Sequence, residues 1–399
     1  MYFIYITEGN PVNERILISG ASIAGLTLAS WLARHGLRPT VVERAPALRA
    51  GGNGVDVRDQ AVTVAERMGI MEDVRAAAAD VRGMKFVDAD DRAVARVAVG
   101  EPGAVEIMRG DLVALLRGTA DVEYLFDDSV RRLDQDDDGV TVTFENAPAR
   151  RFDLVVGADG MHSTVRRLAF GPEERFVRFR GHYFAFADAD ASLGEDRWVT
   201  MYNRPGRMAG IYRSGNHAQA KAYFVFRSAR PAYDPRDLAQ HRRLLREAFA
   251  GDTSWHTKEL LAAALADPDF YFDALGQVRM DSWSTGRVVL TGDAAWCASP
   301  ASGAGAELAL VGAYRLAGEL AAAGGDHRVA FPRYEAGHRS LADKKQQIGP
   351  NVRMMVPRTT AGRMLRDAVA RSPLPRVMDA LEQRLRTGPR PLPEYAPAR

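Results

Sequence analysis

The chain has 399 residues, of which 53 are Lys or Arg and 51 are Asp or Glu, for a formal net charge of +2. This length allows one large domain or two closely joined domains with a sizeable core. The near balance of charge gives no general reason to expect a nucleic acid or an anionic membrane as partner. The single cysteine, Cys297, excludes an internal disulfide and fits a reducing cytoplasm; we expect it to be buried rather than reactive.

The sequence also argues against secretion and membrane insertion. Residues 1–13 lack the basic region and the apolar core of a secretion signal. Residues 294–314 carry one charge, Glu307, but they contain Pro, Ser and Gly, which favours a buried loop and helix over a membrane span. We therefore expect a cytoplasmic protein, a monomer or a homodimer, that neither enters a membrane nor binds nucleic acid.

The N-terminal part predicts a β-turn-α-β unit of about 30 residues. A strand at Arg15–Ser19 leads into a Gly-rich turn, Gly20–Gly25. Helical spacing follows over Leu26–His35, Gly36 ends that helix, and Pro39–Glu43 is a second strand with an acid at its end.

The next segments continue the alternation of helices and strands. Helices are predicted at Gln60–Gly69 and Asp111–Gly118, with hairpin strands between Val81 and Met108. Strands at Val122–Phe126 and Val140–Phe144 are expected to bracket an acidic hairpin tip, Asp134–Asp138, and Asp153–Val156 is another buried strand.

Residues 175–285 are richer in aromatic residues and in strand-like runs. Strands are predicted at Tyr183–Ala187, Trp198–Tyr202 and Ala222–Phe226, and helices at Ala239–Ala250 and Lys258–Leu265. After Gly305 the chain is predicted to be helical to about Arg386 and to end in a Pro-rich tail.

This order predicts an α/β fold. A Rossmann-like nucleotide-binding domain (residues 1–80, 105–174 and 286–325) is interleaved with a sheet-rich substrate domain (81–104 and 175–285). Residues 326–399 form a helical C-terminus and tail.

Three motifs carry the chemistry, and the first is the Gly-rich turn. Gly20 permits a tight turn and Gly25 permits close helix–strand packing, while Ser22 stands where the usual pattern has its second glycine. Such a turn alone can be merely structural. Glu43, eighteen residues after Gly25, fits a carboxylate that binds a ribose; Arg44 either covers the adenine or is solvated.

The second and third motifs place carboxylates at strand ends. Asp159 follows the strand Asp153–Val156 and precedes a short helix near Ser163; the alternative is that it only caps this turn. Asp293 follows the apolar run Val288–Leu290, where it can hold ribose or ribitol hydroxyls. Backbone N–H groups at the start of the next helix, after Pro300, Gly303, Ala304 and Gly305, can face an anion.

Together these motifs resemble the FAD-dependent class A monooxygenases of the para-hydroxybenzoate hydroxylase fold, over Arg15–Leu320. Glu43–Arg44, the loop Gly52–Asp56 and the run Glu106–Leu112 look like the tetracycline-inactivating and polyketide-hydroxylating branch. The resemblance implies FAD, held without a covalent bond by Gly20, Ser22, Ile23, Ala24, Gly25, Glu43, Arg44, Asp56, Arg109, Asp159, Asp293, Pro300, Gly303, Ala304 and Gly305. Two positions depart from the family pattern: Trp296 is often histidine, and Gly312 is commonly an acid.

The resemblance also implies a reaction. NADPH or NADH reduces FAD, oxygen adds at C4a to give a flavin hydroperoxide, and one oxygen passes to an aromatic or polyketide-like small molecule. The cofactor carries the hard step, so no catalytic side chain and no metal site is expected. His162, His182 and His217 are expected to be structural or surface residues.

The wall of the substrate site is expected on the strands of residues 175–285. Candidates are Phe184, Phe186, Met201, Arg207, Tyr212, Tyr223 and Phe224. The alternative for each aromatic residue is ordinary core packing, and strand alternation lets only about half of them face the site.

Other reactions remain open. The same cofactor could support Baeyer–Villiger insertion or an oxygen-independent oxidation or reduction, and a non-catalytic flavin-binding protein is a further alternative. A flavin halogenase is disfavoured because no Trp-x-Trp-x-Ile-Pro sequence is present.

Overall fold

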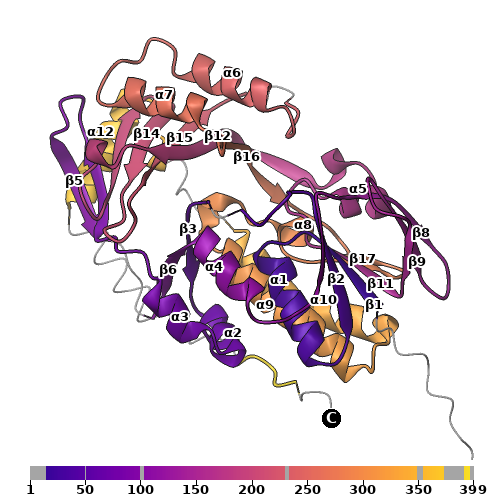
Figure 1. Cartoon of the computed structure of the whole chain (residues 1–399). Coiled ribbons are helices and arrows are strands. Elements are labelled where there is room, and N and C mark those ends of the chain that lie inside the picture. The colour runs from indigo at the N-terminus through magenta and orange to yellow at the C-terminus, as the bar shows by residue number, and fades with distance from the viewer. Residues whose placement is uncertain are drawn as a thin grey trace, which may run out of the picture.

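The computed structural model describes residues 15–49, 51–98, 103–229, 233–347, 354–372 and 391–395. Two large sheets dominate it, one of six strands and one of seven, and the chain passes between them several times (Figure 1). The mixed α/β class with a helical C-terminal region is as predicted. No helix in these ranges is long and apolar enough to cross a membrane.

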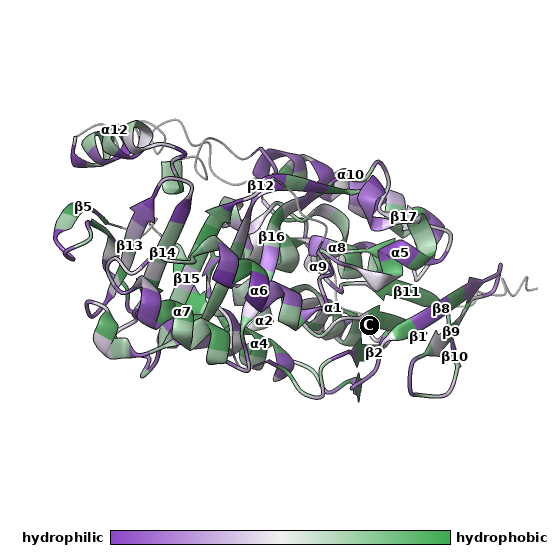
Figure 2. Ribbon diagram, turned by 90° about the horizontal axis from the view of Figure 1, so that it is seen from above, coloured by the Kyte–Doolittle hydropathy of each residue, from purple (hydrophilic) through white to green (hydrophobic). Residues whose placement is uncertain are grey.

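The six-stranded sheet has the order β17-β18-β11-β1-β2-β7. Its strands are β1 (Arg15–Ser19), β2 (Arg38–Glu43), β7 (Glu123–Phe126), β11 (Leu154–Gly157), β17 (Ser284–Thr285) and β18 (Val288–Leu290). All neighbours are parallel except the edge pair β17–β18. The central strands are almost fully buried, and Figure 2 shows β1, β2 and β11 as mainly hydrophobic. Such near-continuous apolar strands are typical of parallel sheets that are covered on both faces.

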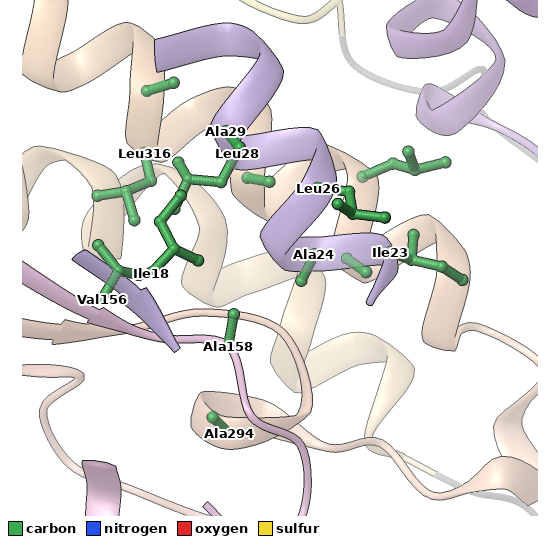
Figure 3. Packing of buried hydrophobic residues seen from close by; sticks show 14 of the residues in the cluster. Ile18, Ile23, Ala24, Leu26, Leu28, Ala29, Val156, Ala158, Ala294 and Leu316 are labelled. Atoms are coloured by element: carbon green, nitrogen blue, oxygen red, sulfur yellow. The ribbon is translucent and has the colours of Figure 1, made fainter. Parts of the chain in front are cut away.

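Helices surround this sheet, some in direct contact and some through other helices: α1 and α5 contact its strands, α4 and α9 pack on α1, and α2 and α10 pack on α9. The helices of this part are α1 (Ile23–Arg34), α2 (Gln60–Met68), α3 (Met71–Ala76), α4 (Arg109–Arg117), α5 (Thr164–Phe170), α8 (Asp293–Trp296), α9 (Gly305–Ala322) and α10 (His327–Lys345). In Figure 3, Leu28 of α1 lies close to Ile18 of β1 and Leu316 of α9. Helix α1 begins earlier than predicted because the Gly-rich turn itself runs into the helix at Ile23.

Two small sheets complete this part. They are β3 (Gly54–Val57) with β6 (Val105–Met108), and β8 (Val130–Gln135) with β9 (Val140–Phe144) and β10 (Arg150–Phe152). The acidic segment is a hairpin tip, but the strand before it is β8, so that part of the prediction was wrong. Val122–Phe126 instead supplies β7, because its residues pair in parallel with β2.

The seven-stranded sheet has the order β16-β12-β15-β14-β13-β4-β5. Its strands are β4 (Gly83–Val87), β5 (Ala93–Ala98), β12 (Val177–Ala189), β13 (Trp198–Arg204), β14 (Arg207–Tyr212), β15 (Ala220–Arg227) and β16 (Tyr271–Val278). Only the pair β13–β4 is parallel. The β4–β5 hairpin is as predicted, whereas β6 leaves it to pair with β3.

Helices α6 (Leu238–Ala248) and α7 (Thr257–Ala266) cover the face of this sheet that points away from α1 and α9 (Figure 1). Their buried side chains include Leu245 and Leu260, which join one apolar cluster with alternate residues of β12 and β15. The opposite face of the sheet is therefore the one that turns toward the rest of the molecule.

The C-terminal helices are α9, α10 and α12 (Thr360–Arg371), which contacts β5 and β13. The predicted helical run to about Arg386 extends into residues 373–390, which lie outside the described residues, as does most of the predicted tail.

Candidate cofactor and substrate site

The three predicted motifs meet at one edge of the six-stranded sheet. Gly20 follows β1, Glu43 ends β2, Asp159 follows β11 and Asp293 follows β18, and these strands are parallel. Because parallel strands end at the same edge, all three motifs lie at the carboxyl ends of the strands. This crevice is where open α/β sheets bind their ligands.

The Gly-rich turn needs both of its glycines. A Cβ at Gly20 would lie 2.5 Å from the Ala158 carbonyl oxygen, and φ at Gly20 is +107°. A Cβ at Gly25 would lie 1.9 Å from the Gly20 carbonyl oxygen. Ser22 precedes α1, whose first residues, Ile23 and Ala24, are buried. The turn therefore brings bare backbone to the sheet edge, as a cradle for a phosphate requires.

Glu43 lies beside this turn. Its Oε2 accepts a hydrogen bond from the Ala21 N–H at 2.8 Å, and its Oε1 accepts one from the Ala45 N–H at 2.9 Å. Both oxygens keep lone pairs for a ligand hydroxyl, because a carboxylate has about four acceptor positions. Arg44 is exposed next to it.

Glu43→Ala is expected to weaken FAD binding about ten- to a hundredfold, because a charge-assisted hydrogen bond contributes roughly 1.5–3 kcal/mol. Titration of the apoprotein with FAD measures this. The two backbone bonds of Glu43 also predict a small loss of thermal stability. Glu72→Gln, at an exposed position on α3, is the control for a lost charge. Unchanged FAD affinity in Glu43→Ala would place the ribose contact elsewhere.

Arg109 connects two of the predicted segments. It begins α4, its Nη2 donates to Ser22 Oγ at 3.1 Å, and its backbone N–H donates to the Asn53 carbonyl at 3.0 Å. Burial lowers the pKa of the guanidinium, and the nearby groups Tyr271, Glu43 and Asp293 oppose that shift. A permanent positive charge thus lies among the turn, the loop before β3 and the end of β18.

Asp159 has a structural role. Its Oδ2 accepts from the backbone N–H groups of Thr164 and Val165 at 2.8 and 3.1 Å, and its Oδ1 accepts from Ser163 Oγ at 2.5 Å. These bonds satisfy donors at the start of α5. The capping alternative is therefore present, and a cofactor contact of Asp159 stays a prediction.

Asp293 begins α8 directly after Gly292, whose φ is +61°. A Cβ at Gly292 would lie 2.8 Å from the Ala24 Cβ, so the third motif packs against the first. The residue is exposed, yet burial raises the pKa of its carboxyl, while Arg109 lowers it. Solvent access combined with many surrounding protein atoms is what a concave surface produces.

The loop from Ser299 to Gly305 packs against the protein at Ala304, and its last residue, Gly305, is accessible. Ser299 has a φ of +79° and Gly303 one of +61°; Pro300 lies between them, and Ala304 is buried. Within the described residues, and apart from its chain neighbours and the backbone of α9, no atom lies within 4 Å of a Cβ built on Gly305, the first residue of α9. The start of α9 therefore presents accessible backbone.

Below this loop, buried Glu307 forms an ion pair with Lys345 at 2.5 Å, and Lys345 Nζ also lies 3.2 Å from Asp59 Oδ2. Asp56 approaches the loop from β3, with its Oδ2 3.6 Å from a Cβ built on Gly303. The predicted residues fit FAD on these observations: turns that only glycine can form, an open helix start, and carboxylates and one arginine around the same edge.

Five of the seven predicted wall residues lie on the face of the seven-stranded sheet opposite α6 and α7, called the free face below, on part of which Val356 and Ala370 pack. Directly paired residues of neighbouring strands share a face. Phe186 pairs with Tyr223, Tyr223 with Gly210, and Gly210 with Met201. Phe184 and Tyr212 belong to the same face by alternation. Ala301 of the loop before α9 packs against the apolar cluster on this face, so the face is turned toward the candidate cofactor site.

The prediction was wrong for Phe224 and Arg207. Phe224 is fully buried and packs edge-on against Phe249, with ring centroids 5.0 Å apart, beneath α6. Arg207 pairs with Phe226, which also lies on the covered face. Strand alternation places both side chains toward the helices, away from the substrate face.

Sequence reasoning missed Tyr271. It begins β16, pairs with Phe186 of β12 and stacks on that ring at 4.7 Å with an interplanar angle of 15°. Its hydroxyl donates to Asp273 Oδ2 at 3.0 Å. The aromatic run Tyr271–Phe272 was the available signal.

The three histidines named in the sequence analysis, His162, His182 and His217, all contact other protein groups. His162 bridges Glu173 and Asp273 at 3.0 Å each, and these carboxylates overcome the effect of burial and raise its pKa to about 9. His182 contacts the Arg180 carbonyl at 3.0 Å, and His217 lies 3.2 Å from Asp111.

The two departures from the family pattern meet in space. A Cβ built on Gly312 would lie 2.6 Å from Cζ2 of Trp296, so the indole fills the space that any larger residue at 312 would need. The same ring lies 4.6 Å from buried His338, whose pKa burial lowers to about 3. The large residue at 296 and the glycine at 312 therefore accompany each other, because the indole occupies the space beside Gly312.

A cavity of about 370 Å³ is lined in part by Ala295 and Trp296 of α8. Its lining includes Arg279, Trp296 and Gln346, and none of the predicted site residues. The candidate site is therefore separate from this cavity and lies at the sheet edge, where Ala301 packs against the cluster on the seven-stranded sheet. Among the described residues no three His, Cys, Asp or Glu side chains gather as metal ligands.

Comparisons with known proteins agree with this geometry. The FAD binding domain family model matches residues 14–331. An uncharacterized Mycobacterium tuberculosis protein (Rv1260) is 44% identical, covering 84% of this chain and 92% of that protein. A flavin-dependent monooxygenase of Legionella longbeachae is 37% identical, covering 84% and 88%. The crystal structure of tetracycline destructase Tet(51) superposes with a TM-score of 0.82 at 32% identity, covering 96% of this chain and all of that one.

Proposed function

The chain belongs to the FAD-binding domain family and is an FAD-dependent monooxygenase, and we propose that it uses NADPH or NADH and O2 to hydroxylate an aromatic or polyketide-like small molecule. The neighbouring structure is named as a tetracycline destructase, and an FAD-dependent monooxygenase of Sarocladium schorii is 33% identical. The tetracycline destructase supports a ring-containing substrate, and the Sarocladium schorii relative supports the monooxygenase activity. The single, buried cysteine supports a cytoplasmic location.

The observation that carries the proposal is the row of aromatic side chains on the free sheet face. Phe186 and Tyr271 stack, Tyr223 lies beside them, and all three are partly exposed. Tyr271 also interacts electrostatically with Arg109 and Asp293, so one end of the row is near the groups expected to hold the cofactor. Aromatic faces favour flat, ring-containing ligands.

When bound, FAD supplies the redox and oxygen chemistry. The chain's own residues would bind and orient it: the turn that Gly20 and Gly25 permit would present backbone to the phosphates, Glu43 would accept from a ribose hydroxyl, and Asp293 would accept from ribityl hydroxyls. Arg109 would supply a positive charge beside them. The apolar wall excludes water from the reacting groups.

Oxygen uptake tests the reaction. The FAD-loaded protein is mixed with NADPH or NADH, with and without a panel of polycyclic phenols, and product masses are determined. We expect substrate-stimulated oxygen uptake and a product heavier by one oxygen atom. A ring-expanded lactone would instead indicate Baeyer–Villiger insertion. Flavin reduction without oxygen uptake would indicate an oxygen-independent oxidoreductase, and no reduction at all a binding protein.

The flavin is expected to leave the protein on acid precipitation. Cys297 is buried, and burial raises the pKa of its thiol well above the usual value, so it is a poor nucleophile. The yellow colour should remain in the supernatant and match free FAD by chromatography. Colour that stays with the precipitated polypeptide would show a covalent link.

A further inference from the structure

The row of rings on the free sheet face has four members from four neighbouring strands. Tyr212 of β14, Tyr223 of β15, Phe186 of β12 and Tyr271 of β16 follow one another, with successive centroid distances of 6.2, 6.0 and 4.7 Å. The row runs across the strands, and strands are about 4.8 Å apart. Phe186, Tyr223 and Tyr271 are partly exposed, whereas Tyr212 is buried at its end of the row. A ligand with several fused rings matches the three exposed rings better than a single ring does.

At the Tyr271 end of this row, the tyrosine hydroxyl already has a hydrogen-bond partner in the protein. Tyr271 donates to Asp273, which also accepts from Tyr233 at 2.5 Å and lies 3.0 Å from protonated His162. The negative charge of Asp273 is therefore compensated within the protein. Asp273 therefore offers a ligand no unpaired charge at this end.

The Tyr212 end is different. The carboxyl group there belongs to Glu106, and no cationic side chain of the described residues pairs with it. Tyr212 donates to Glu106 Oε1 at 3.0 Å, and Glu106 pairs across the β3–β6 ladder with Asp56. No Lys, Arg or His side chain in the described ranges forms an ion pair or hydrogen bond with Glu106. It is partly buried but keeps solvent access. Burial, then the nearby Asp56 charge, raises the pKa of Glu106 against the effect of the Tyr212 bond.

We propose that Glu106 is a specificity-determining residue that binds a basic nitrogen, as a protonated amine, on a polycyclic substrate lying over the aromatic row. A cation compensates the Glu106 charge and also lowers its repulsion with Asp56, which a neutral hydroxyl cannot do. Tyr212 fixes the carboxyl at the end of the row. The inference rests on the proposed function, since it assigns the substrate class of the same site.

Two matched ligands test it: a polycyclic phenol with an aminomethyl group and the same compound with a hydroxymethyl group. Binding to the FAD-loaded protein is followed by the change in flavin absorbance, without NADPH. The wild type should bind the amine about tenfold more tightly, because the ammonium adds a charge–charge attraction to a hydrogen bond that the hydroxyl also makes. Glu106→Gln should lose this preference, and Glu72→Gln, which removes an exposed charge on α3, should keep it.

Tyr212→Phe separates the carboxyl from the phenol: the preference for the amine should persist, because Glu106 remains. Flavin content and thermal unfolding show that each variant is folded and loaded. An amine preference that survives in Glu106→Gln, or its absence in the wild type, overturns the inference. If the neutral phenol is still hydroxylated in that case, the proposed function stands. If neither compound binds or is oxidised by the wild type, both fail.

Discussion

Asp293→Ala is expected to yield a folded protein that is largely empty of FAD. Asp293 begins α8 at the end of β18, opposite Arg109, where the ribityl chain is expected to pass. A carboxylate would repel a phosphate, so its expected partners are the ribityl hydroxyls. Each charge-assisted hydrogen bond contributes about 1.5–3 kcal/mol, so two of them correspond to roughly a hundredfold or more in affinity. Flavin content after purification, and activity restored by excess FAD, measure the effect.

Asp293→Asn is the matched variant, because it keeps an acceptor oxygen and removes the charge; it should retain more FAD than the alanine variant. Normal FAD content and turnover in Asp293→Ala would mean that the third motif has been misread. Failure of Asp293→Ala to fold even with FAD present would assign the residue a structural role.

Phe224→Ala is expected to destabilise the protein by about 3–5 kcal/mol, because it removes a fully buried ring and leaves a cavity beneath α6. Denaturant unfolding with FAD present measures this loss. Tyr223→Ala, one residue earlier, truncates a partly exposed ring on the opposite face. It should cost less stability and should weaken the binding of polycyclic phenols.

Comparing the Phe224→Ala and Tyr223→Ala variants tests which face of the sheet each side chain lies on. Equal losses of stability would contradict the placement of Phe224 in the core beneath the helices. A Phe224→Ala protein with wild-type stability and weakened substrate binding would restore Phe224 to the substrate wall.

The sequence was sufficient to predict the candidate cofactor site at the carboxyl ends of the six-stranded sheet, because the motifs that mark it are local in sequence. Gly20 and Gly292 mark turns that follow short apolar strands, and Gly25 lets the first turn of α1 approach the Gly20 carbonyl. Once the strands are parallel, their carboxyl ends meet without any further information. The motifs therefore predicted both the elements and their convergence.

The substrate wall could not be predicted in the same way. Alternation says that neighbours such as Tyr223 and Phe224 face opposite sides, but the sequence does not say which side the helices cover. That choice depends on α6 and α7, which follow β15 in the chain. Tyr271 joins the row only through the antiparallel pairing of β16 with β12, about 85 residues apart. The strand β7 was assigned to a hairpin for the same reason, since its partner β2 is distant in sequence.

The contact between Trp296 and Gly312 constrains the order in which these two positions can change during evolution. With the indole in place, even a methyl group at 312 meets a ring atom at 2.6 Å, and His338 lies on the same side at 3.2 Å. A smaller residue at 296 leaves Gly312 tolerable, at the expense of a cavity. A chain with this pair can therefore reach a histidine and acid pair only by changing position 296 first, and the reverse path requires position 312 to change first.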